Sequence, residues 1–245
     1  ETNKIDLKLF YKKRLKRILP NLIFILSITY FIYLIIGPPD ITLWNDYLSS
    51  ILGVSNFYFL LSNKGYFYNI FDNPFAHTWS LGVEEQFYFI YPFLAFLFLD
   101  FLKKKNFFLF LLIILILLSL LFAFYFFKIN PDTSFYFSPL RFWELGFGCL
   151  CYFINNKFNK NSFFSIIFLV LIFGVIFINM TENVIINNLI IIFLSGFFII
   201  SYRNISFLEN SFFLYLGKIS YSFYLWHLPI IFFINIYFEE TLYKI

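Results

Sequence analysis

Seven stretches of the chain are apolar over roughly the length of a membrane span, and short polar segments separate them. A helix needs ~20 mostly apolar residues to cross the ~30 Å hydrocarbon core of a bilayer. The stretches are residues 20–36, 79–99, 106–127, 139–154, 163–178, 187–201 and 216–237. The pattern predicts an all-α fold, a polytopic transmembrane helix bundle with about seven spans.

The segment 47–61 is too polar and too short for a span, so we expect it to be interfacial or re-entrant, in an outer loop over 37–77. No long soluble segment, fixed-period repeat or Pro-, Gly- or Ser-rich linker breaks the pattern. The sequence therefore predicts one membrane domain over residues 1–245 and no soluble domain.

Basic residues gather on one side when the loops are placed alternately. Lys64, Lys128 and Lys244 fall on the far side, Arg141 lies at the outer end of a span, and the other 14 of the 18 Lys and Arg fall on the amino-terminal side. Lys4 and Lys157 belong to that larger group. Excess Lys and Arg marks the cytoplasmic side. We expect a multi-pass protein of the cell (inner or plasma) membrane whose amino-terminal end is cytoplasmic.

Composition agrees with a bilayer environment. Hydrophobic residues make up 61% of the chain and charged residues 13%, against about 45–50% and about 25% in soluble proteins. The net charge of +4 could suggest nucleic acid in a soluble protein, but its placement here follows topology, so no nucleic-acid partner is expected. Cys149 and Cys151 point to different faces of a helix, which predicts neither a disulfide nor a metal site.

Ionisable groups within a span are costly and need a reason. The string HTWSLGVEEQ places Glu84 and Glu85 one to two turns into the second span. One interpretation is a helix cap, with Thr78 or Ser80 capping and the acids complementing the helix dipole. The other is a functional site, because two carboxylates and a Gln exceed what a cap requires.

The string SPLRFWELGFG places Arg141 and Glu144 three residues apart, so they share a helix face and can pair. Gly146 and Gly148 permit close helix approach. The pair is either a structural ion pair or part of a site.

The string LGKISYSFYLWHLP forms a polar stripe of Ser220, Tyr224 and His227 on an otherwise apolar helix. His227 lies near the middle of its span. It is either a packing residue or a proton-transfer group, because His titrates near neutral pH.

The string FYKKRLKRILP opens the first span. Its charges either set topology and contact lipid headgroups, or Arg14 and Arg17 bind a phosphorylated ligand such as the nucleotide of acyl-CoA.

These four strings, in this order, resemble the acyltransferase-3 family of membrane acyltransferases over nearly the whole chain; HTWSLGVEEQFY is the most specific of them. The resemblance implies transfer of an acyl group, often acetyl, from cytoplasmic acyl-CoA to a hydroxyl of a cell-surface or exported carbohydrate or glycolipid. Acyl-CoA is then a donor substrate, and no permanently bound cofactor is expected.

The resemblance also implies two spans before this chain's first and one after its last. The family's first helix carries an Arg and a His central to transfer, and neither occurs here. We therefore expect a fragment that lacks the residue expected to act as base.

Under this hypothesis Arg14 and Arg17 hold the donor at the cytoplasmic side. Glu84 or Glu85 and the Arg141–Glu144 pair shape the outer, acceptor side, and His227 and Tyr224 stabilise an oxyanion or relay a proton. The alternative function is a proton-coupled transporter or flippase of a glycan or lipid intermediate, which buried Glu, Arg and His also suit. The absence of paired half-repeats argues against it.

Overall fold

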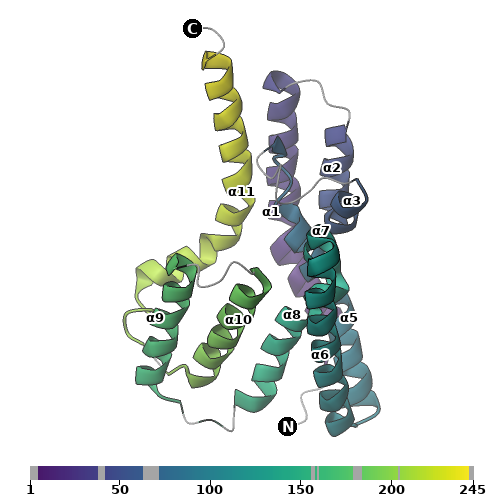
Figure 1. The fold of residues 1–245 in the computed structure, drawn as a ribbon, viewed down its shortest axis with the longest axis vertical. Coiled ribbons are helices and arrows are strands. Elements are labelled where there is room, and N and C mark those ends of the chain that lie inside the picture. The colour runs from purple at the N-terminus through teal and green to yellow at the C-terminus, as the bar shows by residue number, and fades with distance from the viewer. Residues whose placement is uncertain are drawn as a thin grey trace. The chain divides into compact units, whose positions relative to one another are not determined.

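A computed structural model describes residues 5–37, 42–62, 72–155, 158, 160–178, 184–203 and 205–242, with side chains up to Tyr237. Every regular element in these ranges is helical (Figure 1). The helices are α1 (Leu7–Ile36), α2 (Thr42–Ile51), α3 (Ser55–Leu61), α5 (Thr78–Ala95), the π-helix η2 (Phe96–Phe101), α6 (Lys105–Ile129), α7 (Pro131–Tyr136), α8 (Ser138–Ile154), α9 (Ser162–Ile178), α10 (Val184–Ser201) and α11 (Ser211–Leu242). The predicted all-α fold is confirmed.

Each of the seven predicted apolar stretches lies within a helix or, for 79–99, within α5 continued by η2. Four helices are long and apolar enough to cross a bilayer: Leu7–Ile36, Lys105–Ile129, Val184–Ser201 and Ser211–Tyr237. Ser162–Ile178 is a shorter apolar helix. The count of seven spans stays a prediction, and Lys4, Lys64, Lys157 and Lys244 lie outside the described residues.

Helix α1 begins thirteen residues before the predicted start of the first span, at Leu7 rather than Pro20. Asp6 caps it by accepting a hydrogen bond from the backbone N–H of Leu9 (2.9 Å). Lys and Arg are good helix formers, so the basic string continues the helix instead of ending it. At 1.5 Å per residue, α1 is about 45 Å long and exceeds the ~30 Å hydrocarbon core.

The described chain divides into two compact units. The first holds α1, α2, α3, α5, η2, α7 and α11 from Gly217 onward; the second holds α6, α9, α10, nearly all of α8 and the start of α11. The core of the first unit is built from buried apolar side chains of α1, α2, α5 and α11 with Phe75. They are Leu22, Ile25, Leu26, Tyr33, Leu43, Phe75, Leu81, Leu225 and Phe232.

Helices α1 and α5 run antiparallel within the first unit. Early in α1, the Tyr11 hydroxyl donates to the Phe89 carbonyl late in α5 (2.9 Å). The backbone N–H of Ile5 donates to Asp100 in η2. This pairing sets the basic half of α1 beside the acidic half of α5.

The segment 47–61 forms the end of α2 and all of α3, and neither helix is long enough to span. Helix α2 packs on α1 through the stacked rings of Tyr30 and Tyr47 (4.9 Å between centroids) and a 2.9 Å hydrogen bond between the Ser27 and Tyr47 hydroxyls. Its position in the bilayer stays a prediction.

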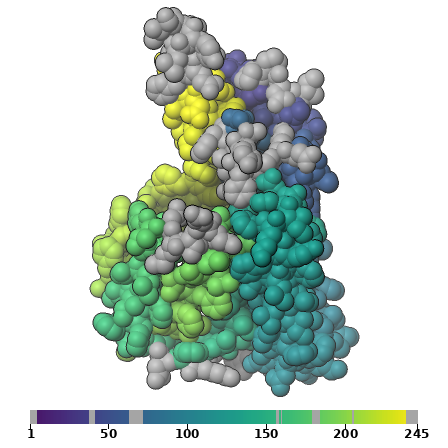
Figure 2. All heavy atoms as spheres, in the orientation of Figure 1, coloured from purple at the N-terminus to yellow at the C-terminus, as the bar shows by residue number. Residues whose placement is uncertain are grey.

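In the second unit, α9 and α10 lie side by side, and their green atoms adjoin one another in Figure 2. Gly146 of α8 approaches α6 closely: a Cβ there would lie 2.9 Å from Ile116. The prediction of a close helix approach is confirmed for Gly146. It is wrong for Gly148, because a Cβ added there would have no atom within 4 Å. The close contact that the sequence did not indicate is at Gly196 of α10, beside Phe147 and Cys151 of α8.

Candidate functional site

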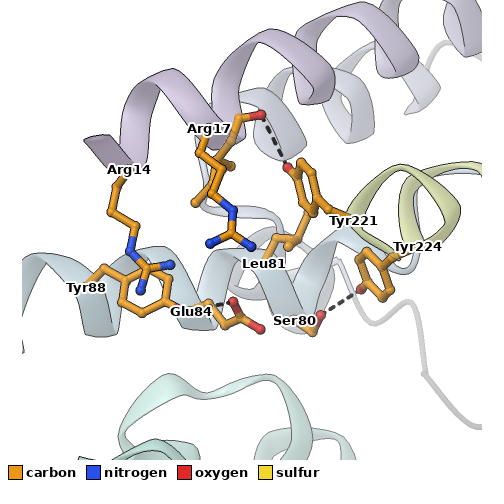
Figure 3. Close-up of a pocket in the computed structure, with 9 residues that line it drawn as sticks. Arg14, Arg17, Ser80, Leu81, Glu84, Tyr88, Tyr221 and Tyr224 are labelled. Carbon is orange, nitrogen blue, oxygen red and sulfur yellow. Dashed lines mark hydrogen bonds between the residues drawn. The ribbon is translucent and has the colours of Figure 1, made fainter. Parts of the chain in front are cut away.

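A cavity of about 240 Å³ in the first unit gathers polar side chains from three helices (Figure 3). We call it the α1–α5–α11 pocket. Its lining residues are Arg14, Arg17, Ile18, Ser80, Leu81, Glu84, Tyr88, Tyr221 and Tyr224. Three of the four strings singled out in the sequence therefore meet in one place, although they are separated by up to about two hundred residues of chain.

Arg14 and Glu84 are joined through Tyr88. The Arg14 guanidinium lies over the Tyr88 ring, 4.0 Å from its centroid, an arrangement that attracts the cation to the negative face of the ring. The Tyr88 hydroxyl donates to a Glu84 carboxylate oxygen (3.3 Å). The charge of Arg14 is thereby balanced within the protein.

Arg17 differs from Arg14 although only three residues separate them. Its side chain is exposed, and in Figure 3 its guanidinium extends from α1 toward α5. The neighbouring Ile18 carbonyl accepts a hydrogen bond from the Tyr221 hydroxyl (3.4 Å), which ties α11 to α1 beside it. Because Arg17 lines the cavity and is solvent-exposed, its five N–H donors are placed to receive an anion.

Glu84 and Glu85 face different surroundings. Glu84 lines the pocket, whereas the Glu85 carboxylate lies against Gly53, in the turn between α2 and α3. Gln86 makes a third set of contacts: its amide donates to the Asn56 side chain (2.9 Å) and to the Gly53 carbonyl (3.2 Å). Only Glu84 of the two predicted carboxylates therefore belongs to the pocket.

Two sequence-based interpretations are wrong. Neither Thr78 nor Ser80 caps α5, because Thr78 donates to the Phe75 carbonyl (2.8 Å) and Ser80 pairs with the Tyr224 hydroxyl (2.7 Å). Glu84 was also expected on the opposite side from Arg14 and Arg17, but the antiparallel packing of α1 and α5 puts all three around one cavity.

Arg141 and Glu144 belong to the second unit and form the predicted ion pair, with 2.8 Å between guanidinium nitrogen and carboxylate oxygen. Their side chains are 18% and 17% exposed, so the pair is mostly buried. Behind them, Ser119 of α6 donates to the Pro139 carbonyl (2.7 Å) and accepts from the Trp143 N–H (3.0 Å). These bonds fix the start of α8 on α6.

Comparison with known proteins identifies the family of this chain. A model described as an acyltransferase domain, that of the acyltransferase-3 family, matches residues 1–243. The chain belongs to the acyltransferase-3 family. It is 33% identical, over 98% of its length, to the O-acetyltransferase OatA of Staphylococcus aureus strain NCTC 8325 / PS 47. It is 30% identical, again over 98%, to a putative O-acetyltransferase of S. aureus strain COL.

The chain spans 43% of the length of each of these relatives. No solved structure matches it. Membership of this membrane family, together with the long apolar helices, makes it a multi-pass membrane protein.

His77, which immediately precedes α5, is a candidate site residue of this acyltransferase-3 chain that the sequence did not indicate. It is 4% exposed, and neither ring nitrogen has a hydrogen-bond partner among the described residues. Its ring lies 5.2 Å from that of His227 and 5.3 Å from that of Tyr224, between centroids. We call His77 and His227 the histidine pair. The available signal was the rarity of His, since the chain contains two.

Tyr224 connects the histidine pair to the pocket. Its hydroxyl lies 2.5 Å from the His77 carbonyl oxygen and 2.7 Å from the Ser80 hydroxyl. Its own carbonyl oxygen lies 2.5 Å from Nδ1 of His227. A carbonyl can only accept, so the proton sits on Nδ1 and Nε2 of neutral His227 carries a lone pair. Ser220 stands apart from this cluster, exposed and bonded to Gly217 of its own helix.

Burial, and to a smaller extent the neighbouring His227, lower the pKa of His77 to about 3. The carbonyls of Pro74 and Leu225 oppose this in part, although neither meets hydrogen-bond geometry with the ring. Because the charged form of a buried imidazole loses its hydration, His77 is neutral at physiological pH.

Proposed function

We propose that the protein is an O-acyltransferase that takes an acyl group, acetyl by preference, from acyl-CoA and passes it to a hydroxyl of a cell-surface or exported carbohydrate or glycolipid. The α1–α5–α11 pocket is the observation that carries this proposal. Family membership supports the reaction class, and the names of the relatives support acetyl transfer to oxygen. Acyl-CoA acts as a substrate, and no resident cofactor is part of the proposal.

The donor end of the pocket is Arg17. A guanidinium offers a planar set of donors that matches phosphate oxygens, and charge-assisted hydrogen bonds are about twice as strong as neutral ones. Arg17 is exposed at the cavity, while Arg14 is occupied by Tyr88 and Glu84. We therefore assign phosphate binding chiefly to Arg17 and the shaping of the cavity to Arg14.

The reacting end is formed by Ser80 and Tyr224, which line the pocket, and His227 lies against Tyr224 outside that lining. The acceptor oxygen attacks the thioester carbon, a C–O bond forms, the C–S bond breaks, and CoA leaves as a thiolate. The acceptor proton passes to a base and then to that thiolate. Nε2 of His227 carries a lone pair that can relay this proton, and the paired hydroxyls of Ser80 and Tyr224 are donors suited to the oxyanion.

The proposal also assigns the membrane side at which acyl-CoA binds. Because 14 of the 18 basic residues fall on the amino-terminal side of the predicted spans, we place that end at the cytoplasmic face of the plasma membrane, where acyl-CoA is available. Glu84 lies with the donor-binding residues rather than on the acceptor side.

The test compares Arg17→Ala with Lys16→Ala in the full-length protein in liposomes, supplied with radiolabelled acetyl-CoA. Lys16 is an exposed cation of α1 that does not line the pocket, so it controls for the loss of charge. We expect KM for acetyl-CoA to rise about 10–100-fold in Arg17→Ala only, since a hydrogen bond to a charged group contributes about 1.5–3 kcal/mol.

Equal changes in both variants would contradict the donor assignment. Release of free CoA distinguishes the reaction class: a transporter or flippase leaves the thioester intact, so wild-type protein that moves substrate without releasing CoA would overturn the proposal.

A further inference from the structure

The imidazole of His77 is a buried polar group that meets hydrogen-bond geometry with none of the described residues. Burying a hydrogen-bonding group without a partner costs about 1–3 kcal/mol, and such groups are rare enough in folded proteins to call for an explanation. The ring is 4% exposed, and both of its nitrogens lack partners among the described residues. Packing alone would be served better by an apolar ring, such as that of the neighbouring Phe75.

Another imidazole lies against this buried ring. The rings of the histidine pair are 5.2 Å apart between centroids and inclined by 73°. His227 is exposed, its Nδ1 is fixed by the Tyr224 carbonyl, and Tyr224 contacts both rings. One imidazole of the pair therefore lies at the surface of the described chain, and the other is buried.

We propose that His77 is a positioning residue, a buried neutral imidazole that accepts a hydrogen bond from His227 while His227 holds the proton that it relays. This inference rests on the proposed function. The acceptor proton reaches His227 as the C–O bond forms, is shared with His77, and passes to the CoA thiolate after the C–S bond breaks. No additional reactant is needed.

The surroundings favour one proton on the pair rather than two. His227 lowers the pKa of His77, because two adjacent imidazolium ions repel. Tyr224 contacts both rings. The pocket that Tyr224 lines also holds three charged side chains, those of Arg14, Arg17 and Glu84. His77 thus stays a lone-pair acceptor when His227 becomes charged.

The test measures the reactivity of the His227 imidazole without needing the acceptor. Diethyl pyrocarbonate reacts with unprotonated imidazole, so its rate at His227 at a fixed pH, followed by peptide mass spectrometry, reports a change in the hydrogen bonding of that ring. The protein is the full-length chain in liposomes. His77→Phe removes the hydrogen-bond acceptor, and His77→Gln keeps one.

We expect the modification rate of His227 to rise by up to about tenfold in His77→Phe, because the protonated ring loses a charge-assisted hydrogen bond, and to stay near wild type in His77→Gln. The rate of CoA release at saturating acetyl-CoA falls about 10–100-fold in His77→Phe, as for other groups that orient a reacting residue, with KM for acetyl-CoA unchanged.

Trp79→Phe is the matched control. Trp79 is also buried and lies two residues from His77, but its ring contacts the rings of Phe135 and Tyr136. An unchanged modification rate of His227 in His77→Phe, or an equal change in Trp79→Phe, overturns the inference. If His77→Phe does not accumulate, the smaller His77→Leu takes its place. Failure of the proposed function is separate, since wild-type protein would then release no CoA whatever the modification rate shows.

Discussion

The α1–α5–α11 pocket and the Arg141–Glu144 pair are both polar sites on otherwise apolar helices, yet they are built in opposite ways. The pair lies three residues apart on one helix, and each charge neutralises the other at 2.8 Å. The pocket combines side chains of α1, α5 and α11 around a cavity and leaves Arg17 exposed within it. An ion pair whose two charges neutralise each other contributes to packing, whereas an open cavity with an exposed cation on its wall is suited to binding a ligand.

The largest expected effect comes from removing the pocket acid that Tyr88 links to Arg14. Glu84→Gln is expected to lower acetyl transfer about 10–100-fold, because it removes the charge-assisted hydrogen bond from Tyr88 and the carboxylate that lines the pocket with Arg14 and Arg17. The adjacent Glu85→Gln is the control, since Glu85 faces Gly53 rather than the pocket. Transfer is measured with radiolabelled acetyl-CoA and normalised to membrane abundance. Equal losses of acetyl transfer in both variants would contradict the assignment of Glu84 alone to the pocket.

Breaking the pair of the second unit is expected to affect stability instead. Arg141→Ala leaves a mostly buried Glu144 without its cation and is expected to cost about 1–3 kcal/mol, the usual cost of a buried group that loses its partner. Thermal unfolding in detergent measures this, and KM for acetyl-CoA stays at the wild-type value. The double variant Arg141→Met with Glu144→Leu recovers stability, because it removes both charges. A stable Arg141→Ala protein that fails to transfer acetyl would assign the pair to the site.

Acid is expected to weaken the first unit through His77. The pKa of His77 is about 3 in the folded protein and about 6.5 when unfolded. The unfolded state therefore binds the proton first, and stability is complete above pH 6.5 and is lost as the pH falls toward 3. The slope approaches about 1.4 kcal/mol per pH unit. Unfolding temperatures at pH 7 and pH 5 measure it, and His77→Gln, which cannot titrate, shows a flatter profile if His77 is responsible.

The smallest effect distinguishes two glycines. Gly53 adopts φ +68°, and a Cβ there would collide with the Glu85 carboxylate, so Gly53→Ala is expected to cost about 1–2 kcal/mol from the left-handed conformation alone. Gly148 lies within α8 with open space around it, and Gly148→Ala is expected to stabilise by about 0.5–1 kcal/mol. Unfolding temperatures of the two variants in detergent move in opposite directions; a shift of the same sign in both contradicts the assignment.

Much of the fold could be predicted from the sequence, because apolar runs long enough to span a bilayer leave the backbone few alternatives to helix. The boundaries of the predicted stretch 163–178 differ from those of Ser162–Ile178 by one residue. The start of α1 was missed by thirteen residues, since charged residues end an apolar run without ending a helix. The Arg141–Glu144 pair was predictable because helical geometry alone brings such neighbours together.

The sequence by itself determined the all-helical fold, the family and the polar residues that call for explanation. Only the tertiary structure decided which of those residues meet. The antiparallel packing of α1 against α5 turned Glu84 toward Arg14 and Glu85 toward Gly53, and it placed His77 behind His227. Periodicity describes one helix at a time, whereas a site built from three helices depends on how they pack, and no spacing along the chain encodes that contact.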